Sequence, residues 1–533
     1  MVEVMLRIGA SVLMATFFCV MTMKMLGAMQ QSGYKNVTFW RWLRRKENML
    51  FNRLSVLSLC MALGSAVFAL CFSFLDKRYA LAISAIPVLA LLVLYLRADE
   101  KYALKISANK TGRYCRMFAA YYLFALCFCY LFISCLNFLS VWNGSALYAL
   151  IAYVPFSLTP MCLPFLLMGA NACASVFENA RNKKFVKRAG QVLDETQIIR
   201  VAVVGSYGKT SVKNILKSVL SQKYSVVETP QSFNTPMGIA RTVFSLEFAN
   251  KQVFIAEMGA RKQGDISELC TLVKPDYAVF TGVCAQHIQT FGNREEVFAE
   301  KSEILNTNAF VVCGESLREQ VNDKFGGREN TAFCDASIVK DVQFYATETE
   351  FTLTLGGKNV RVTTPLLGES ALENMLLAAT LAYQMGLTPE EIGIGLKNVK
   401  YVPHRLQLIN ANGVYILDDG YNANEKGAKQ AINALNRFKG RRCIVTPGIV
   451  ECGVLEKDIN EKLGAQIAQA QIDTVILVGD TLVGAVKNGY LQASGIKENL
   501  FIVPTLEKAK PLINSRVSTG DCVLFLNDLP DVY

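Results

Sequence analysis

The sequence of 533 residues is poor in histidine and contains no Cys-x-x-Cys pair. Only His287 and His404 occur, and the 16 cysteines are scattered through the chain. A structural zinc site built from paired cysteines is therefore not expected. Internal repeats and low-complexity tracts are also absent from the sequence, so nothing points to an array of repeated units.

Charge is scarce as well, since 19% of the residues are charged against 52% that are hydrophobic. The mean hydropathy of +0.27 is high for a soluble protein, and the apolar excess lies before about residue 175. A membrane span needs about 17–25 apolar residues. The stretch 79–96 is borderline, but four others reach that length, so we expect about five transmembrane helices. The four are residues 5–29, 54–75, 117–138 and 146–168.

Basic residues predict the orientation of these helices. Lysine and arginine gather after the first, third and fifth stretches, whereas the other two loops carry only Lys77 and Arg78. Loops rich in basic residues remain on the cytoplasmic side of a membrane. We therefore expect a multi-pass cell-membrane protein with its N-terminus outside and everything after residue 175 in the cytoplasm. The net charge of +11 then reflects membrane topology, and no nucleic-acid partner is expected.

From residue 198 onward, short apolar runs alternate with helical stretches, as in parallel sheets covered by helices. An antiparallel hairpin is expected within residues 339–364, and a hinge at 401–408. The expected strands are 200–204, 253–258, 278–283, 413–417, 443–445, 474–478 and 523–526. The expected helices include 212–221, 266–273, 295–305 and 372–385.

The most informative segment is residues 201–211, Val-Ala-Val-Val-Gly-Ser-Tyr-Gly-Lys-Thr-Ser. It predicts a buried strand, a glycine loop and a helix that opens at Lys209. Glycines let backbone N–H groups approach a phosphate, and a helix N-terminus favours negative charge. A lysine there can reach the outer phosphates, and the Thr210 hydroxyl can hold Mg²⁺. The two glycines are closer together than in the common form of this loop, so an ordinary strand–turn–helix junction is the alternative.

Three further segments place polar side chains near the ends of expected strands. Glu257 ends an apolar run, and a carboxylate there faces the ligand crevice of a parallel sheet and can hold Mg²⁺. His287 and Lys301 follow the next strand. Taken alone, His287 indicates a structural histidine, and Lys301 indicates a surface lysine. Residues 418–424, Asp-Asp-Gly-Tyr-Asn-Ala-Asn, end a later strand, with a simple turn as the alternative.

Together these segments resemble the Mur ligase family. The motifs GSYGKTS, NTPMG, EMGARKQGDI, GVCAQH, VPHRLQ and DDGYNAN occur in the family's order over about residues 198–533. EMGAR and DDGYNAN are most similar to the MurF branch, which adds D-alanyl-D-alanine to the muramoyl tripeptide. The resemblance implies an α/β fold with a central P-loop-like ATP-binding domain at 198–400 and a C-terminal Rossmann-like domain at 401–533. These would follow an α-helical transmembrane region at 1–175 and a basic cytoplasmic linker at 176–197.

The resemblance also implies an ATP-dependent amide-forming ligase of cell-wall precursor synthesis that uses two Mg²⁺ ions. ATP converts a carboxylate into an acyl phosphate, and the amine of an amino acid or dipeptide then attacks it. Positioning and charge neutralisation dominate such chemistry. Closure of two domains around the nucleotide would keep water away from the acyl phosphate.

Within the central domain, the resemblance assigns phosphate and metal roles. Lys209 is expected to neutralise the β- and γ-phosphates, Thr210 and Glu257 to bind Mg²⁺, and His287 to ligate a second Mg²⁺. Lys301 matches a lysine that several family members carbamylate, which would make it a carboxylate-like metal ligand and requires a lowered pKa. The other loop residues expected to bind the nucleotide are Gly205, Ser206, Gly208 and Ser211.

The resemblance assigns further roles around the hinge and the C-terminal domain. Arg405 is expected to reach the γ-phosphate as that domain closes, and Asp419 to hold the ribose. Asn374 belongs to the family's adenine-binding motif. The residues expected to shape the substrate side of the site are Asn234, Tyr421, Asn422 and Asn424.

The chain departs from the family pattern in three places. Residues 368–374 read Gly-Glu-Ser-Ala-Leu-Glu-Asn and keep only the first and last residues of the adenine motif, and Gly420 stands where serine is usual. The apolar region also occupies the place of the family's UDP-sugar-binding domain. A UDP-linked precursor and a lipid-linked precursor held by the helices are therefore alternative substrates. Pro155, Pro160 and Pro164 in the last stretch can mark a broken helix that lines a cavity for the lipid, although a simple kink is the more common reason for prolines in a span. A catalytically inactive scaffold that recruits cell-wall enzymes is a further alternative, which the retained Lys209 and Thr210 argue against.

Overall fold

The computed structural model describes residues 2–44, 50–71, 90, 93, 108–142, 147–245, 248–284, 293–421, 424–450 and 455–527. The chain forms two compact units, and the boundary along the sequence falls between Arg181 and Asn182. Each unit has its own hydrophobic core.

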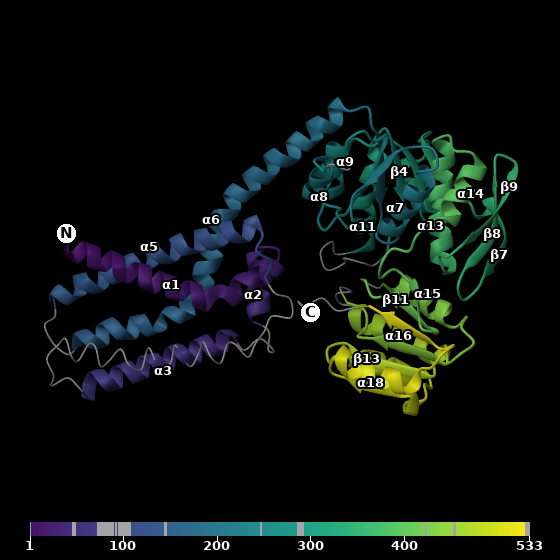
Figure 1. The fold of residues 1–533 in the computed structure, drawn as a ribbon. Helices are drawn as coiled ribbons and strands as arrows, with labels where there is room; N and C mark the ends of the chain where they lie inside the picture. Colours follow the sequence, from purple (N-terminus) through teal and green to yellow (C-terminus); the bar gives the residue numbers. More distant parts are fainter. Residues whose placement is uncertain are drawn as a thin grey trace. The chain divides into compact units, whose positions relative to one another are not determined.

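The first unit consists of apolar helices (Figure 1). Helices α1 and α5 pack along each other, and Met25, Tyr121 and Leu167 are buried in the core between the helices. Within this core the hydroxyls of Thr22 and Tyr121 share a hydrogen bond of 2.7 Å. The helices are α1 (Val2–Gln31), α2 (Asn36–Leu43), α3 (Leu50–Cys71), α5 (Gly112–Trp142) and α6 (Leu147–Glu195).

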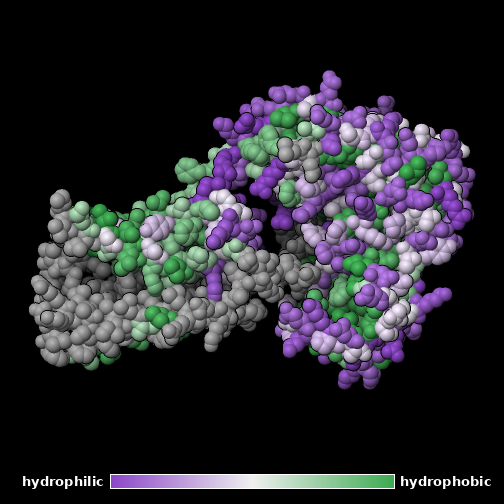
Figure 2. Space-filling view, viewed as in Figure 1, coloured by the Kyte–Doolittle hydropathy of each residue, from purple (hydrophilic) through white to green (hydrophobic). Residues whose placement is uncertain are grey.

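Three helices in the described part of the chain are long and apolar enough to cross a membrane. They overlap the expected stretches 5–29, 117–138 and 146–168. The described apolar part of α3 is shorter, and stretch 79–96 lies almost entirely outside the described residues. About five spans were expected, and the described residues support three. Figure 2 shows hydrophobic residues on the surface of these helices. The three candidate spans are Arg7–Gln31, Gly112–Cys135 and Met161–Glu195.

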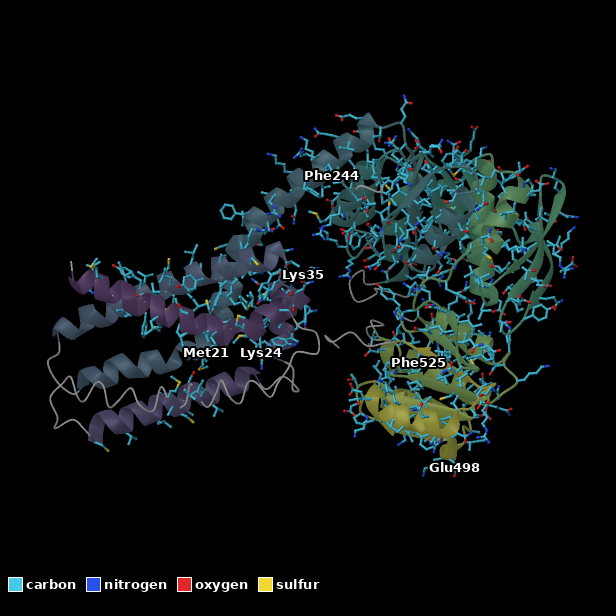
Figure 3. All side chains as sticks on the ribbon, viewed as in Figure 1. Met21, Lys24, Lys35, Phe244, Glu498 and Phe525 are labelled. Carbon is cyan, nitrogen blue, oxygen red and sulfur yellow. The ribbon has the colours of Figure 1, made fainter. Side chains whose placement is uncertain are left out.

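Residues 176–197, expected as a linker, largely continue helix α6 to Glu195. No glycine or proline lies between residues 170 and 189 to interrupt the helix. Ala189 and Leu193 are fully buried in the core of the second unit. The Phe185 ring contacts Phe244, labelled in Figure 3, at a centroid distance of 4.8 Å. The last turns of α6 are thus part of the second unit.

After the last turns of α6, the second unit continues with a six-stranded parallel sheet. Val203 of the central strand β1 lies beside Glu257 of β3. Because alternate residues of a strand face opposite sides, Val201 and Val203 enter one buried cluster, and Ala202 and Val204 enter the other. In spatial order the strands are β2 (Val226–Glu228), β3 (Val253–Glu257), β1 (Ile199–Val204), β4 (Tyr277–Phe280), β5 (Phe310–Cys313) and β6 (Thr331–Phe333).

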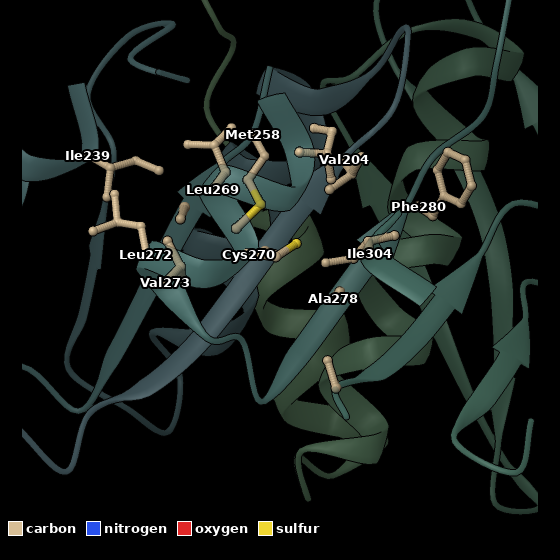
Figure 4. Packing of buried hydrophobic residues seen from close by; sticks show 14 of the residues in the cluster. Val204, Ile239, Met258, Leu269, Cys270, Leu272, Val273, Ala278, Phe280 and Ile304 are labelled. Carbon is tan, nitrogen blue, oxygen red and sulfur yellow. The ribbon is translucent and has the colours of Figure 1, made fainter. Parts of the chain in front are cut away.

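Helices cover both faces of this sheet. On the Val203 side lie α7 (Lys209–Leu220), α13 (Gly368–Gln384) and α14 (Pro389–Lys397). On the Val204 side lie α8 (Pro236–Val243), α9 (Asp265–Val273), α11 (Arg294–Lys301) and the end of α6. Figure 4 shows Leu269, Met258 and Ile304 in the cluster on the Val204 side. Two expected helices have different bounds: α13 begins at Gly368 rather than 372, and a short 3₁₀ helix (Ser302–Asn306) follows α11.

Residues 339–364 form three antiparallel strands instead of the expected hairpin, namely β7 (Val339–Phe344), β8 (Thr349–Leu355) and β9 (Lys358–Thr364). Gly356 and Gly357 make the turn between β8 and β9 with φ of 55° and 79°. Phe351 and Val362 face the cluster beneath α14. The additional strand β7 is irregular, with a register shift between Lys340 and Gln343, which weakens its alternating pattern.

The C-terminal domain contains a second six-stranded sheet, in which only the pair β10–β11 is antiparallel. In spatial order its strands are β10 (Gln407–Ala411), β11 (Val414–Asp419), β15 (Cys522–Leu526), β12 (Arg442–Thr446), β13 (Thr474–Val478) and β14 (Leu500–Val503). Strands β10 and β14 were not expected. One face is covered by α15 (Glu425–Leu435), α16 (Glu456–Gln469) and α17 (Val483–Gln492), and the other by α18 (Leu506–Arg516).

Candidate functional site

The glycine loop connects strand β1 to helix α7 and fits tightly against its neighbours. Gly208 has a φ of 74°, and a Cβ added there would lie 2.5 Å from Oδ1 of Asn374 on α13. The N–H of Ser206 donates to the Gly282 carbonyl at 2.8 Å, and the Thr281 hydroxyl donates to the Tyr207 carbonyl at 2.5 Å. Glycine is therefore needed at position 208 for both its backbone angle and its lack of a side chain.

The N-terminus of α7 opens directly from this loop. Its N-cap is Gly208, and no side chain caps it. The first N–H groups of a helix have no partner within the helix and attract anions. The Ser206 hydroxyl is buried without a hydrogen-bond partner in the described residues, and Ser211 lines the cleft beside the loop. The loop and helix start thus provide donors suited to a phosphate group.

Lys209 lies over the loop. Its Nζ donates to the carbonyls of Gly205 and Ser206 at 2.8 and 3.4 Å. Burial lowers the pKa of Lys209, and the nearby Arg405 lowers it as well, against the opposing charge of Glu257. Two cations therefore approach the same loop, an arrangement that a polyphosphate would stabilise.

A buried carboxylate lies beside the start of α7. Glu257, the last residue of β3, is 1% exposed. Its Oε2 accepts from the Thr210 hydroxyl at 2.9 Å, and its Oε1 accepts from Nδ2 of Asn234 at 3.3 Å. Lys213 Nζ lies 3.2 Å from the same Oε2. The structure thus brings Thr210, Glu257 and Asn234 together, and it adds Lys213, which sequence reasoning missed.

The oxygen atoms of Thr210 and Glu257 are the type of ligand that Mg²⁺ prefers. No group of three or more metal-binding side chains occurs within the described part of the chain. His287, the expected ligand of a second ion, lies outside the described residues, and so does Asn422. The donor set therefore fits one Mg²⁺ that is completed by phosphate oxygens or water.

Lys301 is buried and not on the surface, as its sequence context alone suggested. It is 1% exposed at the end of α11, where the neighbouring Phe298 ring stacks at 6.2 Å on Phe280 of strand β4. Burial lowers the pKa of Lys301 to about 7, and the charge of Lys209 contributes. The adjacent Glu300 is engaged elsewhere, because its carboxylate accepts from the N–H groups of Gly264 and Ile266 at 2.7 Å each. A substantial fraction of neutral amine near pH 7 is what carbamylation would require.

The cleft beside the glycine loop is lined on the C-terminal side by residues 400–402, 405 and 406 and by the end of β11. The Arg405 guanidinium lies 4.4 Å from the ring centroid of Tyr421 and donates to the Tyr421 carbonyl at 3.2 Å. The Tyr421 hydroxyl lies 3.1 Å from the hydroxyl of Ser232, which follows strand β2 of the first six-stranded sheet. Asp419 accepts from the Leu406 N–H at 3.0 Å, and burial raises the pKa of Asp419 to about 6. Both expected residues, Arg405 and Asp419, thus face one region.

Two side chains near this part of the cleft differ from what the sequence indicated. The Asn424 Oδ1 accepts from the Gly427 N–H at 2.9 Å and caps helix α15, so this oxygen is already engaged. His404, for which no role was predicted, places Nδ1 2.8 Å from Oδ2 of Asp418 and has a φ of 61°. Its sequence signal is its place in the VPHRLQ motif, next to Arg405.

The cleft lies within the second unit. Its apolar lining includes Ile215, Leu367 and Ala371, a surface suited to a planar ring next to the phosphate loop. Two ion pairs join α13 to the C-terminal domain: Glu373 to Lys426 at 2.6 Å and Glu369 to Arg437 at 2.8 Å. The expected site residues that line the cleft are Gly208, Ser211, Asn374, Arg405, Asp419, Tyr421 and Asn424.

Two segments of the chain match domains of one enzyme family. Residues 203–382 match the Mur ligase middle domain, and residues 404–527 match the Mur ligase glutamate ligase domain. Together these segments make up more than half of the chain.

Curated relatives include two UDP-N-acetylmuramoyl-tripeptide–D-alanyl-D-alanine ligases. The protein of Bacillus subtilis is 29% identical over 340 residues, which is 61% of this chain and 72% of the relative. The protein of Escherichia coli is 32% identical over 292 residues, which is 52% of this chain and 64% of the relative. The matched part therefore spans about two thirds of each relative's length.

Solved structures of similar fold include MurF ligase from Thermotoga maritima in complex with ADP, with a TM-score of 0.58 and 27% sequence identity. The match covers 65% of this chain and 80% of that chain. MurF from Acinetobacter baumannii has a TM-score of 0.57 at 22% identity, covers 65% of this chain and 77% of that one, and supports the fold. The chain therefore belongs to the Mur ligase family, near the MurF ligases, and its enzyme class is that of an ATP-dependent amide-forming ligase.

Proposed function

We propose that this chain is a MurF-type ligase of cell-wall synthesis. It would join the amine of an amino acid or a dipeptide, such as D-alanyl-D-alanine, to a carboxylate of a muramoyl-peptide precursor. The observation that carries the proposal is the arrangement around one cleft. Gly208 and Ser211 line the cleft together with Arg405 and Asp419, and the hydrogen-bonded pair of Thr210 and Glu257 lies at the start of helix α7, directly after the glycine loop.

The described residues fit ATP and Mg²⁺. The uncapped start of α7 and the Ser206 hydroxyl, which has no partner within the described residues, suit phosphate, while Thr210 and Glu257 offer oxygen ligands for the ion. When bound with Mg²⁺, ATP supplies the phosphoryl group that makes an anionic carboxylate reactive towards an amine. We further propose that His287 and a carbamylated Lys301 hold a second Mg²⁺.

The chain's own residues would bind, orient and exclude water. Lys209 and Arg405 provide positive charge from two domains where phosphate oxygens would lie. Asp419 would accept a hydrogen bond from the ribose. Asn374 would contact adenine, in a motif whose Ser370 and Ala371 depart from the family pattern. Asn234, Tyr421, Asn422 and Asn424 would shape the space for the peptide substrate.

Phosphate release tests the proposal. The full chain in detergent micelles would receive ATP, Mg²⁺, D-alanyl-D-alanine and UDP-linked muramoyl tripeptide. We expect turnover that depends on both substrates and falls at least about 100-fold in Lys209→Ala, because a preorganised charge that acts on the transition state is lost. Lys217→Ala, on the exposed face of the same helix, is the matched control. Absence of turnover with every precursor would instead favour an inactive scaffold.

A lipid-linked precursor is a second candidate substrate. Three candidate membrane spans precede the ligase domains, and a substrate embedded in the membrane would need such helices. The same assay with a polyprenyl-linked precursor in mixed micelles distinguishes the two candidates. Turnover with the soluble precursor alone would rule out the lipid-linked substrate.

We also propose a location at the cell membrane, with the ligase domains on the cytoplasmic face. Exposed basic residues lie in the C-terminal half of the last candidate helix, after its most apolar part, and favour the cytoplasmic side. The nucleotide and precursor pools that such a ligase needs would then be accessible to it. These basic residues are Arg181, Lys183, Lys184, Lys187 and Arg188.

A further inference from the structure

Lys213 occupies a position in the site that the proposed chemistry does not explain. It lies one turn after Lys209 on α7 and is 2% exposed. Its Nζ donates to the carbonyl of Thr229 at 2.7 Å, bonds the carbonyl of Gln231, and lies 3.2 Å from Oε2 of Glu257. Two hydrogen bonds to carbonyl groups and one ion pair thus hold the Lys213 side chain in place.

Glu257 needs this cation when no metal ion is present. The carboxylate is 1% exposed, and its other side-chain partners, Thr210 and Asn234, are neutral donors. A buried charge without an opposite charge is strongly destabilising, and removing one partner of a buried pair leaves such a charge. Within the described residues, Lys213 is the side chain that forms an ion pair with Glu257.

We propose that Lys213 is a positioning residue that serves as the resident counter-ion of Glu257 and holds the carboxylate beside Thr210 before a divalent cation binds. The cation site would then be assembled in the metal-free enzyme, and metal binding would require no ordering of the carboxylate. This inference rests on the proposed function, in which Glu257 is a ligand of Mg²⁺.

A simpler role for Lys213 makes a different prediction. Its bonds to the carbonyls of Thr229 and Gln231 anchor the segment that leads to Asn234. If anchoring were its whole role, loss of Lys213 would destabilise the protein equally with and without metal. If it neutralises Glu257, an added divalent cation should replace part of what the lysine supplied.

Thermal unfolding of the full chain in detergent micelles separates these roles. The variants are Lys213→Met, Lys213→Met with Glu257→Gln, and Lys217→Met as the matched control. Lys217 lies one turn further along α7 and pairs with Glu228 at the surface. Each is measured in EDTA with ADP and in Mg²⁺ with ADP, so that the effect of the ion is isolated.

We expect Lys213→Met to lower Tm in EDTA by about 5 °C or more, and Mg²⁺ to raise its Tm by more than it raises that of the unchanged protein. In the double variant the buried charge is gone, so Tm in EDTA should recover and the response to Mg²⁺ should disappear. Lys217→Met should behave like the unchanged protein within about 1 °C.

Two results would overturn this inference and leave the proposed function intact. One is a Tm of Lys213→Met equal to that of the control in EDTA, and the other is a deficit of the same size in EDTA and in Mg²⁺. Should Lys213→Met fail to fold, the double variant decides, because a counter-ion role predicts that it folds. Failure of the proposed function looks different: the unchanged protein would then show no Mg²⁺-dependent shift with ADP.

Discussion

At the scale of single residues, four ionisable side chains lie in or near the glycine loop, namely Lys209, Lys213, Glu257 and Lys301. Lys213, Glu257 and Lys301 are each at most 2% exposed. Burial of ionisable groups is costly unless they are paired or neutral, and clusters of them are typical of functional sites. Lys213 and Glu257 pair with each other, whereas Lys301 has no ion pair among the residues that the structure describes. The protonation state of Lys301, whose pKa is about 7, therefore changes near neutral pH.

Replacement of Lys301 by methionine should make stability less dependent on pH. The pKa of Lys301 is about 7 in the folded protein, below its ordinary value of 10.5. The unfolded chain therefore binds more protons between pH 7 and 10.5, and stability rises with pH across this window and is lowest below pH 7. The advantage of Lys301→Met should shrink by about 1.4 kcal/mol for each pH unit above 7.

Denaturant titrations between pH 6 and 9 in CO₂-free buffer would measure this difference. Lys262→Met is the control, since that side chain is 80% exposed and should show no such slope. A constant difference between Lys301→Met and the unchanged protein at all pH values would contradict the prediction.

Gly208→Ala should weaken nucleotide binding by at least about 10-fold, because the new Cβ would lie 2.5 Å from Asn374 Oδ1 and move the loop. Positive φ also costs alanine about 1 kcal/mol of stability. Calorimetric titration with ADP would measure the first effect. Gly327→Ala is a matched control, since Gly327 has a φ of 88° and no atom within 4 Å of an added Cβ. Equal ADP affinity in both variants would show that the close approach at Gly208 is unimportant.

The sequence predicted the positions that depend on local structure. Gly208 and Thr210 lie in the predicted strand–loop–helix segment, and Glu257 lies at the end of a predicted strand. The burial of Lys301 and the pairing of Lys213 depend on packing between segments far apart in the chain. Helical spacing from Lys209 could have placed Lys213 on the same face, but not beside Glu257.

At the scale of elements, helices α13 and α15 join the middle and C-terminal domains. Glu373 and Glu369 of α13 pair with Lys426 and Arg437. These glutamates belong to the segment 368–374 that departs from the family's adenine motif. Lys426 also lies 5.0 Å from the ring centroid of Tyr207 in the glycine loop. The departing segment is thus part of the contact between the two domains.

Reversal of charge at Lys426 should destabilise this contact, and a second reversal should restore it. Lys426→Glu places two carboxylates together, which should cost about 1 kcal/mol and lower Tm by about 2–4 °C. Combining it with Glu373→Lys should recover most of the loss, and 1 M NaCl should reduce the effect because both side chains are partly exposed. Calorimetry of the variants measures this, with Lys429→Glu on the same helix as control. A double variant no better than Lys426→Glu would indicate that the pair does not form.

The two strands of the second sheet that the sequence missed both lie at its edges. Strand β10 is exposed over its last three residues, and β14 is apolar throughout but only four residues long. Buried strands such as β1 and β13 were predicted well, because both faces of each are covered and nearly every residue is apolar.

At the scale of the whole molecule, the chain combines candidate membrane spans with a ligase. We expect alkaline carbonate and 1 M salt to leave the protein in the membrane pellet, and detergent to release it, because helices that cross the membrane as proposed would bury apolar surface in lipid. Fractionation with a salt-extractable protein as control tests this. Release by salt would indicate surface attachment through the basic residues instead.

Orientation is open to a separate measurement. Protease added to right-side-out vesicles should leave the ligase domains intact, and the same protease should digest them after the vesicles are opened. Digestion in sealed vesicles would place these domains on the opposite face.

The unbroken course of helix α6 has a practical consequence for any shortened version of this protein. The match to the Mur ligase middle domain begins at residue 203, yet Ala189 and Leu193 are buried in the core of the ligase unit. A chain cut at the start of the recognised homology would expose the hydrophobic hollow that these two side chains occupy, and aggregation would be the foreseeable outcome. The matched family domain and the compact unit therefore begin at different residues, and the compact unit begins at Asn182.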